Sequence, residues 1–359
     1  MMDGKIQELL NRLVQRHSLE LEEYQYLLDH RNEEVVKYIQ EKAVEVRQSI
    51  YGNQVYTRGL IEISNICKND CLYCGIRASN SNCQRYRLTK PEILSCVKQG
   101  VDLGFKTVVL QGGEDPYYSD EILVDIVKTI RSLYPDIAIT LSLGQRSHDS
   151  YQALYDAGAN RYLLRHETAD EIHYGKLHPS NMSWQERMDC IYDLKSIGFQ
   201  VGVGIMVGSP YQSNETIAKD LKFIETIQPD MCGIGPFVPH HDTPFATQER
   251  GSVELTCFLL SLIRLIWPPV LLPSTTALGT IDPKGREKGI LAGGNVVMPN
   301  LSPELVKAKY ELYDGKIHSG NEAGQNFKAL AEIMNGIDYE LVHARGDVKK
   351  EDYIKENKQ

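Results

Sequence analysis

The sequence predicts an α/β protein built as a (βα)8 TIM-type barrel, with an N-terminal helical extension and a short C-terminal extension. From residue 58 onward, short β-branched or apolar runs alternate with helical stretches, a rhythm typical of parallel βα units. Eight such units fit between residues 58 and 312, a span that matches one barrel. A doubly wound open sheet made of the same units is the alternative fold.

The chain divides into three parts: a helical segment at 1–55, the barrel at 56–315 and a partly flexible C-terminal extension at 316–359. In the first part, Leu9, Leu10 and Leu13 form an apolar stripe at helical spacing. The extension is polar, with one apolar helix predicted near 326–335. We expect its charged tail, from Lys349 onward, to be frayed.

Each predicted strand of the barrel is followed by a predicted helix. The strands are expected at 58–64, 106–111, 136–142, 160–165, 200–206, 230–234, 270–274 and 294–298. The helices are expected at 90–103, 119–133, 149–157, 183–197, 214–227, 253–266, 284–291 and 303–312. Thr89 offers a helix cap with Pro91 in the first turn, and Gly104, Gly158 and Gly198 fall where helices must end.

The composition is that of an ordinary globular protein, with 42% hydrophobic and 24% charged residues among 359. The net charge is −9 and the two signs are mixed, which argues against a nucleic-acid partner, because such a partner requires a basic stripe. The most apolar stretch, 257–272, is interrupted by Arg264 and two prolines, so we expect no membrane span. The N-terminus has no apolar signal core, and we therefore expect a cytoplasmic protein with reduced thiols.

Three cysteines follow the first predicted barrel strand at C-x3-C-x2-C spacing: Cys67, Cys71 and Cys74. A loop leaving a strand can wrap three thiolates around one inorganic cluster, and thiolates are the usual ligands of iron–sulfur clusters. A cubane cluster has four irons, so three protein ligands leave one iron open. Zinc is the alternative, but structural zinc sites close with four ligands and no histidine lies nearby in the sequence. The spacing therefore favours an iron–sulfur cluster.

Further unusual residues gather at the predicted strand ends, where barrels place their active sites. Gly112, Gly113 and Glu114 follow the second strand. The two glycines let backbone groups approach a ligand, and the carboxylate can pair with an ammonium group. The fourth strand runs into Arg165 and Glu167. The arginine can clamp a carboxylate, and the glutamate can accept hydrogen bonds from an amine or from ribose hydroxyls.

The later strand ends are less charged. The segments around Met206 and after strand six are apolar and glycine-rich, which suits a flat ring lying against backbone. After strand seven, Thr275 and Thr276 offer hydroxyls to a small polar substrate. Tyr310 and Tyr313 share one helical face and can close the mouth of the barrel. Plain packing is the alternative role for Met206 and for both tyrosines.

The cysteine loop, with Tyr73 just before its third cysteine, resembles that of the radical S-adenosylmethionine (SAM) superfamily. Six further strings narrow the resemblance to the HydE family of [FeFe]-hydrogenase maturases, over roughly residues 5–318. The strings are Arg85-Tyr86-Arg87, Gly113-Glu114-Asp115-Pro116-Tyr117, Tyr162-Leu163-Leu164-Arg165-His166-Glu167-Thr168, Gly233-Ile234-Gly235-Pro236-Phe237, Thr275-Thr276-Ala277-Leu278-Gly279-Thr280 and Asn295-Val296-Val297-Met298-Pro299-Asn300. Their occurrence in one order, more than any single string, carries the resemblance.

The resemblance implies one [4Fe-4S] cluster held by the three cysteines, with the amino and carboxylate groups of SAM on its fourth iron. Gly112, Gly113 and Glu114 are then expected to hold the methionine amine, and Glu167 and Arg187 the ribose and carboxylate parts. Met206 and Val238 are expected beside the adenosine, Tyr73 near the adenine, and Gln111 and Thr140 as further cofactor contacts. The cofactor carries the radical chemistry, and the barrel positions it.

The resemblance also implies a substrate and partners. The substrate is a small iron complex bearing carbonyl, cyanide and cysteine. The expected partners are the maturases HydG and HydF and an electron donor such as ferredoxin or flavodoxin. The residues expected to line the substrate cavity are Gln111, Arg165, Thr275, Thr276, Met298, Tyr310 and Tyr313, with Arg165 and Tyr313 as catalytic candidates.

One departure from the family pattern concerns a second cluster. Many members carry additional C-terminal cysteines, whereas here no cysteine follows Cys257 and the matching region begins at Ser319, so no second cluster is expected. Biotin synthase and methylornithine synthase, which acts on an amino-acid-derived substrate, are the alternatives within the superfamily. Biotin synthase requires ligands for a deeper cluster, for which only Cys232 is a candidate. An iron–sulfur electron carrier is the alternative from another class.

Overall fold

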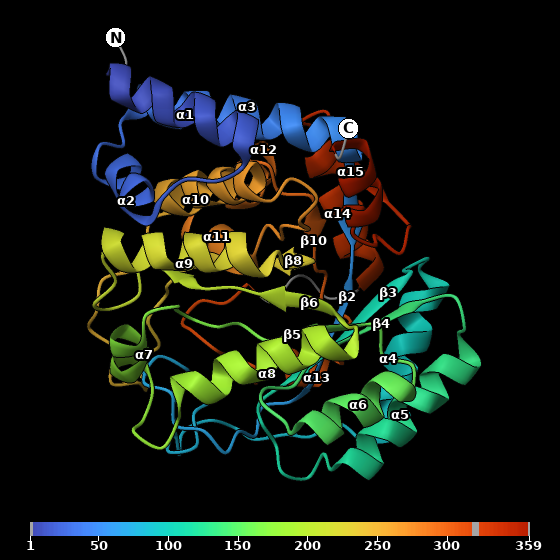
Figure 1. Ribbon diagram of the computed structural model, residues 1–359. Coiled ribbons are helices and arrows are strands. Elements are labelled where there is room, and N and C mark those ends of the chain that lie inside the picture. The colour runs from blue at the N-terminus through green and yellow to red at the C-terminus, as the bar shows by residue number, and fades with distance from the viewer. Residues whose placement is uncertain (1–2, 318–322, 358–359) are drawn as a thin grey trace.

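The computed structural model describes residues 3–317 and 323–357. Its centre is a parallel sheet of six strands that follow one another in chain order and curve into a barrel (Figure 1). They are β2 (Gly59–Ser64), β3 (Thr107–Gly112), β4 (Ala138–Ser142), β5 (Arg161–Leu163), β6 (Gln200–Val203) and β8 (Met231–Cys232). The predicted barrel is therefore confirmed over its first six positions.

The last two positions of the barrel are built from very short pairings. Leu271 bridges to Met231 of β8, and Pro273 bridges to Val296 of β10 (Val296–Val297). Asn300 then bridges to Leu60 of β2, which closes the ring. The strand expected at 270–274 is thus reduced to isolated bridges. A proline lacks the backbone N–H that a strand ladder uses, and Pro273 lies within the expected strand.

A second, two-stranded layer extends the barrel toward its mouth. It consists of β7 (Met206–Val207) paired in parallel with β9 (Gly235–Pro236). At Gly204, between β6 and β7, the backbone lies very close to the backbone at Gly233. A Cβ atom on Gly204 would lie 2.0 Å from the carbonyl oxygen of Gly233. Only glycine fits at this bend, so the strand expected at 200–206 is broken in two.

Helices surround the barrel in the predicted alternation. They are α4 (Lys90–Asp102), α5 (Asp120–Leu133), α6 (His148–Asp156), α7 (Glu171–Leu177), α8 (Trp184–Ile197), α9 (Asn214–Ile227), α10 (Val253–Ile266), α11 (Thr276–Ile281), α12 (Gly285–Leu291) and α13 (Glu304–Lys307). At α4, Thr89 and Glu92 form a reciprocal capping box. The helix expected at 303–312 is only one turn long. The chain after Lys307 instead crosses the barrel mouth.

The N-terminal helices lie against the outside of the barrel (Figure 1). They are α1 (Gly4–Arg16), α2 (Leu21–Asp29) and α3 (Glu33–Tyr51). Helix α3 packs along α10 and α2 along α9. At the α3–α10 contact the buried guanidinium groups of Arg47 and Arg264 donate to the carbonyl oxygens of Gly294 and Gly293, respectively. These bonds satisfy charged groups that would otherwise be costly to bury.

The C-terminal extension packs at the amino-terminal end of the barrel strands. Strand β1 (Gln54–Thr57) pairs with β10 on one side and with β11 (Glu340–Val342) on the other. Helix α14 (Ala323–Asn335) precedes β11, and α15 (Lys350–Asn357) follows it. In α15, Tyr353 lies edge-on to Trp267. The tail that was expected to be frayed is therefore helical over Lys350–Asn357.

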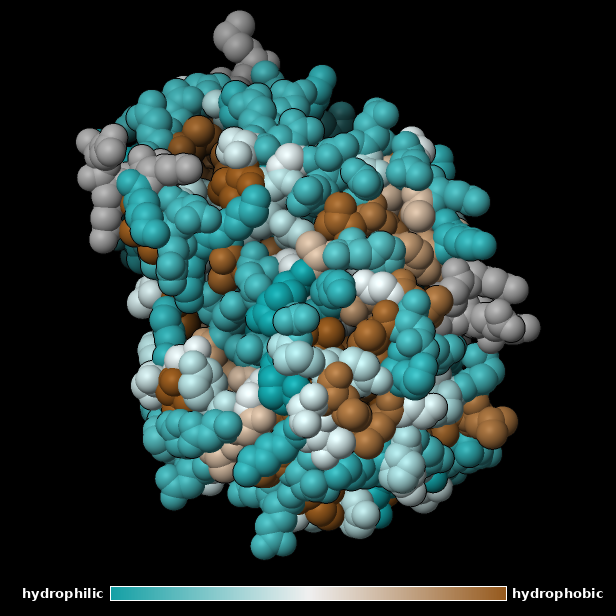
Figure 2. Space-filling view, turned by 90° about the vertical axis from the view of Figure 1, so that its right-hand side faces the viewer, coloured by the Kyte–Doolittle hydropathy of each residue, from teal (hydrophilic) through white to brown (hydrophobic). Residues whose placement is uncertain are grey.

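The surface is of an ordinary kind. Figure 2 shows a face on which polar side chains predominate and apolar ones occur in scattered patches. Within the described ranges, no helix combines the length and the apolar character needed to cross a membrane. Residues 318–322, which include most of the stretch compared with the second-cluster region, lie outside the described residues.

Candidate active site

A cavity of about 380 Å³ opens at the carboxyl ends of the barrel strands. It brings together every predicted site residue except Thr140. These are Cys67, Cys71, Tyr73, Cys74, Gln111, Gly112, Gly113, Glu114, Arg165, Glu167, Arg187, Met206, Val238, Thr275, Thr276, Met298, Tyr310 and Tyr313. The cysteine loop and the threonine pair are more than 200 residues apart in the sequence, yet they line one cavity. The barrel makes this possible because parallel strands present their carboxyl ends at one face.

The cysteine loop is held in place by backbone contacts. The guanidinium group of Arg85 donates to four carbonyl oxygens along the loop, including those of Asn65 at 2.6 Å and Arg77 at 2.6 Å. On the other side, the backbone N–H of Glu114 donates to Cys67 Sγ at 3.4 Å. Most of the contacts that hold the loop are therefore made by its backbone carbonyl groups and not by the thiols.

The electrostatics of the three thiols fit an iron cluster. Burial raises the pKa of Cys71 above its usual value and that of Cys74 to about 12, and negative charge on the neighbouring thiols adds to both shifts. Alone, the thiols would stay protonated at neutral pH. A cluster that binds them as thiolates supplies the positive charge that this environment lacks. Among the described lining residues there is no histidine to complete a zinc site.

Gly113 is required by close packing against the cysteine loop. A Cβ atom at this position would lie 2.3 Å from the carbonyl oxygen of Ile66 and 2.8 Å from Cys67 Cβ. Both are parts of the chain that cannot move without shifting Cys67. The glycine was predicted to let backbone approach a ligand. In the structure it lets the loop approach strand β3.

Gly113→Ala is therefore expected to lower iron content to below half and to reduce stability by about 1–3 kcal/mol, the usual range for overpacking. Iron and sulfide analysis after reconstitution, with thermal unfolding, measures both. Gly175→Ala is the matched control, because a Cβ at this exposed helical glycine meets nothing within 4 Å. Equal iron loading in Gly113→Ala and the control would contradict the packing argument.

The end of β5 carries a compact group of charges. Arg165 Nη2 lies 3.1 Å from Glu167 Oε2, and Arg187 Nη1 donates to the carbonyl oxygen of Arg165 at 2.9 Å. Burial disfavours the charge of Arg187, but Tyr174, Tyr73 and two glutamates nearby hold its pKa above the usual value. Glu167 has a left-handed backbone, with φ of 63°, which is uncommon for a residue other than glycine.

The wall of the cavity contains polar atoms without partners. Thr275 Oγ1 and Arg165 Nε are both buried and have no hydrogen-bond partner among the described residues. Gln111 Nε2 donates to the hydroxyl of Tyr310 at 3.3 Å. Buried polar atoms without partners are costly, so a ligand with complementary groups is expected to satisfy them.

Three charged lining residues were missed in the sequence. Arg286, at the start of α12, lines the cavity with no acidic partner among the described ion pairs. Lys316 reaches into the cavity wall and pairs with Glu62, which is fully buried on β2 and also accepts from Asn300. No sequence signal links Glu62 to Lys316, 254 residues away. They meet because the segment after α13 returns across the barrel mouth.

Tyr73 is oriented by a histidine that was also missed. His178 Nε2 lies 3.2 Å from the Tyr73 hydroxyl, and His178 Nδ1 lies 3.0 Å from the carbonyl oxygen of Tyr174. Since a carbonyl can only accept, Nδ1 carries the proton and Nε2 accepts from Tyr73. Burial lowers the pKa of His178 to about 3, so the ring is neutral.

This neutral histidine predicts a pH dependence of stability. In the unfolded chain His178 binds a proton near pH 6.5, whereas in the folded chain it does not until about pH 3, so stability falls as the pH falls through that window. Between pH 7 and pH 5 the loss is about 2 kcal/mol. Urea unfolding at both pH values should show this loss, and His178→Asn should reduce it. An unchanged pH dependence in the variant would rule the assignment out.

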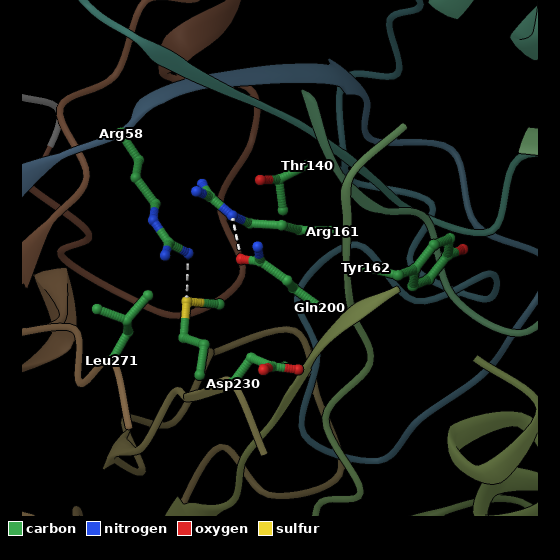
Figure 3. A pocket seen from close by; sticks show the side chains of 9 residues that line it. Arg58, Thr140, Arg161, Tyr162, Gln200, Asp230 and Leu271 are labelled. Carbon is green, nitrogen blue, oxygen red and sulfur yellow. Dashed lines mark hydrogen bonds between the residues drawn. The ribbon is translucent and has the colours of Figure 1, made fainter. Parts of the chain in front are cut away.

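Thr140 is the one predicted site residue that the structure does not bring to the cavity. It lies on β4 two residues before Ser142, so it faces the same side but one layer deeper in the barrel. There it lines a small separate cavity of about 10 Å³ with Arg58 and Arg161. Figure 3 shows both guanidinium groups directed into the same space. Thr140 therefore lies deeper in the barrel than the residues that line the large cavity.

Comparison with known proteins identifies the class of enzyme. Residues 61–224 match the model of the radical SAM superfamily. Two solved structures share the fold. Methylornithine synthase (PylB) has a TM-score of 0.80 and 25% identity over 93% of this chain and 97% of that one. HydG, a maturase of the [FeFe]-hydrogenase, has a TM-score of 0.80 and 21% identity over 96% and 77%. The protein is a radical SAM enzyme, and its cofactors are a [4Fe-4S] cluster and SAM.

A curated relative places the chain within that class. The [FeFe]-hydrogenase maturase subunit HydE of Thermotoga maritima is 45% identical over 275 residues, covering 77% of this chain and 78% of the relative. The chain belongs to the HydE family. The resemblance seen in the sequence is confirmed.

Proposed function

We propose that this protein matures the [FeFe]-hydrogenase, acting on a small iron complex that bears cysteine during assembly of the two-iron subcluster. The main observation behind this proposal is that one cavity is lined both by the three thiols and by polar atoms of Arg165 and Thr275 that have no hydrogen-bond partner among the described residues. The first group suits the cluster and SAM, and the second suits a polar substrate next to them. The family relationship to HydE supports the substrate class.

We assign the cofactor contacts from the cavity lining. Cys67, Cys71 and Cys74 bind three irons of the cluster and leave one for the amino and carboxylate groups of SAM. Glu114 and the two glycines before it face the methionine amine. When bound, the reduced cluster and SAM supply a carbon-centred radical, and the barrel walls exclude water from it.

We assign the rest of SAM to the neighbouring side chains. Glu167 and Arg187 hold its ribose and carboxylate, and Tyr73, Met206 and Val238 surround the base. Tyr73 is kept in one orientation by His178. Thr140 is not included in this site, because it lies one layer deeper in the barrel.

We assign the substrate end to the remaining polar and apolar residues of the cavity wall. Arg165 clamps the cysteine carboxylate of the iron complex, since its Nε is buried without a partner. Thr275 and Thr276 offer hydroxyls, while Gln111 and Tyr310 are already joined by a hydrogen bond. Met298 and Tyr313 complete the wall, and Tyr313, beside Arg165, is the second candidate for direct contact with the reacting complex.

The expected partners follow from this role. HydG supplies the iron complex, HydF receives the product, and a ferredoxin or flavodoxin supplies the electron, all in the cytoplasm. A second candidate function is the synthesis of an amino acid such as methylornithine. It is favoured by the likeness to methylornithine synthase, which covers almost the whole of both chains. An amino acid also carries a carboxylate that Arg165 can clamp, so geometry alone does not separate the two.

The deciding experiment is anaerobic reconstitution, reduction and incubation with SAM, with and without the iron complex made by HydG. Formation of 5'-deoxyadenosine is followed by chromatography and the cluster by EPR. Faster formation with the complex supports the proposal. If 5'-deoxyadenosine formation is unaffected by the complex but is accelerated by an added amino acid, the amino-acid function is favoured and the maturase proposal is wrong.

A further inference from the structure

A buried pair of titratable side chains lies directly behind the charged end of β5. His166 separates Arg165 from Glu167 in the sequence, and Asp220 comes from helix α9. Both side chains are completely buried, and His166 Nε2 lies 3.5 Å from Asp220 Oδ1. Neither lines the cavity. The two residues therefore touch no substrate or cofactor, and they belong to the layer that supports the site.

The hydrogen bonds around His166 define its tautomer. The backbone N–H of Gly204 donates to His166 Nδ1 at 3.3 Å. Because Nδ1 accepts, Nε2 carries the proton, and it faces Asp220 Oδ1 at 3.5 Å without forming a hydrogen bond. The imidazole thus connects the turn between β6 and β7 to helix α9.

Asp220 connects the same helix to the loop that carries the active-site charges. Its Oδ1 accepts from the backbone N–H of Ala169 at 2.5 Å. Its Oδ2 is buried and has no hydrogen-bond partner among the described residues. Burial accordingly raises the pKa of Asp220, although His166 partly offsets the shift. A carboxylate in this position is costly, and an apolar side chain would pack there without that cost.

The loop that the pair holds is strained at one residue. Glu167 has φ of 63°, a conformation that is unfavourable for a side chain with a Cβ. Its backbone N–H donates to the carbonyl oxygen of Gly204 at 3.0 Å, next to the N–H that His166 accepts. His166 and Asp220 therefore fix the backbone on both sides of Glu167. Such a conformation persists only where the surroundings determine it.

We propose that the His166–Asp220 pair is the positioning device of the SAM site. It holds Glu167 in its left-handed conformation and so aims the Glu167 carboxylate into the cavity. His166 and Asp220 are positioning residues that act through Glu167. The inference rests on the proposed role of Glu167 as a SAM contact.

The test measures SAM affinity of the cluster-loaded enzyme by equilibrium dialysis, beside the urea-unfolding midpoint. Asp220→Asn keeps an oxygen for Ala169 but removes the charge that faces His166. His166→Asn keeps an acceptor near Gly204 but does not reach Asp220, whereas His166→Gln places an N–H near the position of Nε2. We expect Asp220→Asn and His166→Asn to weaken SAM binding at least tenfold, and His166→Gln to recover most of it.

A packing control separates positioning from stability. Phe223 lies against the His166 ring, with centroids 4.7 Å apart, and makes no hydrogen bond to the loop. Phe223→Leu is expected to lower the urea midpoint while SAM affinity stays within twofold. If it weakens SAM binding as much as Asp220→Asn does, the pair is merely structural and the proposal is overturned.

Glu167→Gln distinguishes failure of this inference from failure of the cofactor assignment. If Glu167→Gln leaves SAM affinity unchanged, the proposed role of Glu167 is wrong. If Glu167→Gln weakens SAM binding at least tenfold but Asp220→Asn and His166→Asn do not, Glu167 contacts SAM and the positioning role of His166 and Asp220 is wrong. If all three weaken binding and His166→Gln restores it, both assignments hold.

Discussion

Cys71→Ser is expected to reduce SAM cleavage by at least on the order of a hundredfold. Mutating a residue that only orients a metal ligand lowers activity by up to about a hundredfold, and the loss of a ligand should cost at least as much. A serine hydroxyl does not deprotonate at neutral pH and is a poor ligand for iron in a cluster, so one of the three proposed cluster ligands is lost. Since burial already disfavours charge at this position, a neutral hydroxyl stays neutral. Iron content, the EPR signal of the reduced cluster and formation of 5'-deoxyadenosine measure the effect.

The variant chain is expected to fold, because Arg85 and the ion pair between Arg77 and Asp70 hold the loop without the thiols. Cys83→Ser is the matched control. Its thiol is half-buried near the same loop, where it accepts from Asn65 Nδ2 at 3.5 Å, but it does not line the cavity. Equal loss of SAM cleavage in both variants would show that the loop, and not the ligand set, had been disturbed.

Arg165→Gln is expected to weaken substrate binding by roughly 30- to 1,000-fold, which corresponds to about 2–4 kcal/mol for truncation of one partner of a buried charge pair. The variant removes the guanidinium group whose Nε is buried without a partner, and a bound carboxylate then lacks this cation. The loss should appear in the substrate concentration needed to accelerate SAM cleavage. SAM cleavage without substrate should fall much less.

Lys128→Gln serves as the control for charge, because Lys128 is exposed on α5, away from the cavity. If Arg165→Gln and Lys128→Gln need the same substrate concentration to accelerate SAM cleavage, Arg165 does not bind the substrate carboxylate. If Arg165→Gln loses substrate-free SAM cleavage as strongly as coupled cleavage, the role of Arg165 is in the cofactor site, through its ion pair with Glu167.

Much of this site was predictable because barrel geometry converts order along the chain into position in space. Each βα unit delivers the residues just after its strand to the same face, so short motifs after different strands converge. Cys67, Glu114 and Glu167 were located in this way from their places at strand ends alone. Thr140 was expected as a cofactor contact from the family resemblance and not from a strand end, and the structure places it outside the large cavity. It lies within its strand, and its depth in the barrel depends on pleat and register.

The sequence by itself determined the chemistry of this protein: three thiols at cluster spacing, glycines beside them, an arginine at a strand end and the βα rhythm that gathers them. These are local signals, set by spacing and by strand and helix periods. Only the tertiary structure decided the rest: the His178 contact to Tyr73, the Glu62–Lys316 pair and the backbone strain at Glu167. Each of these depends on which segments the packed barrel brings side by side, and sequence separation carries no information about that.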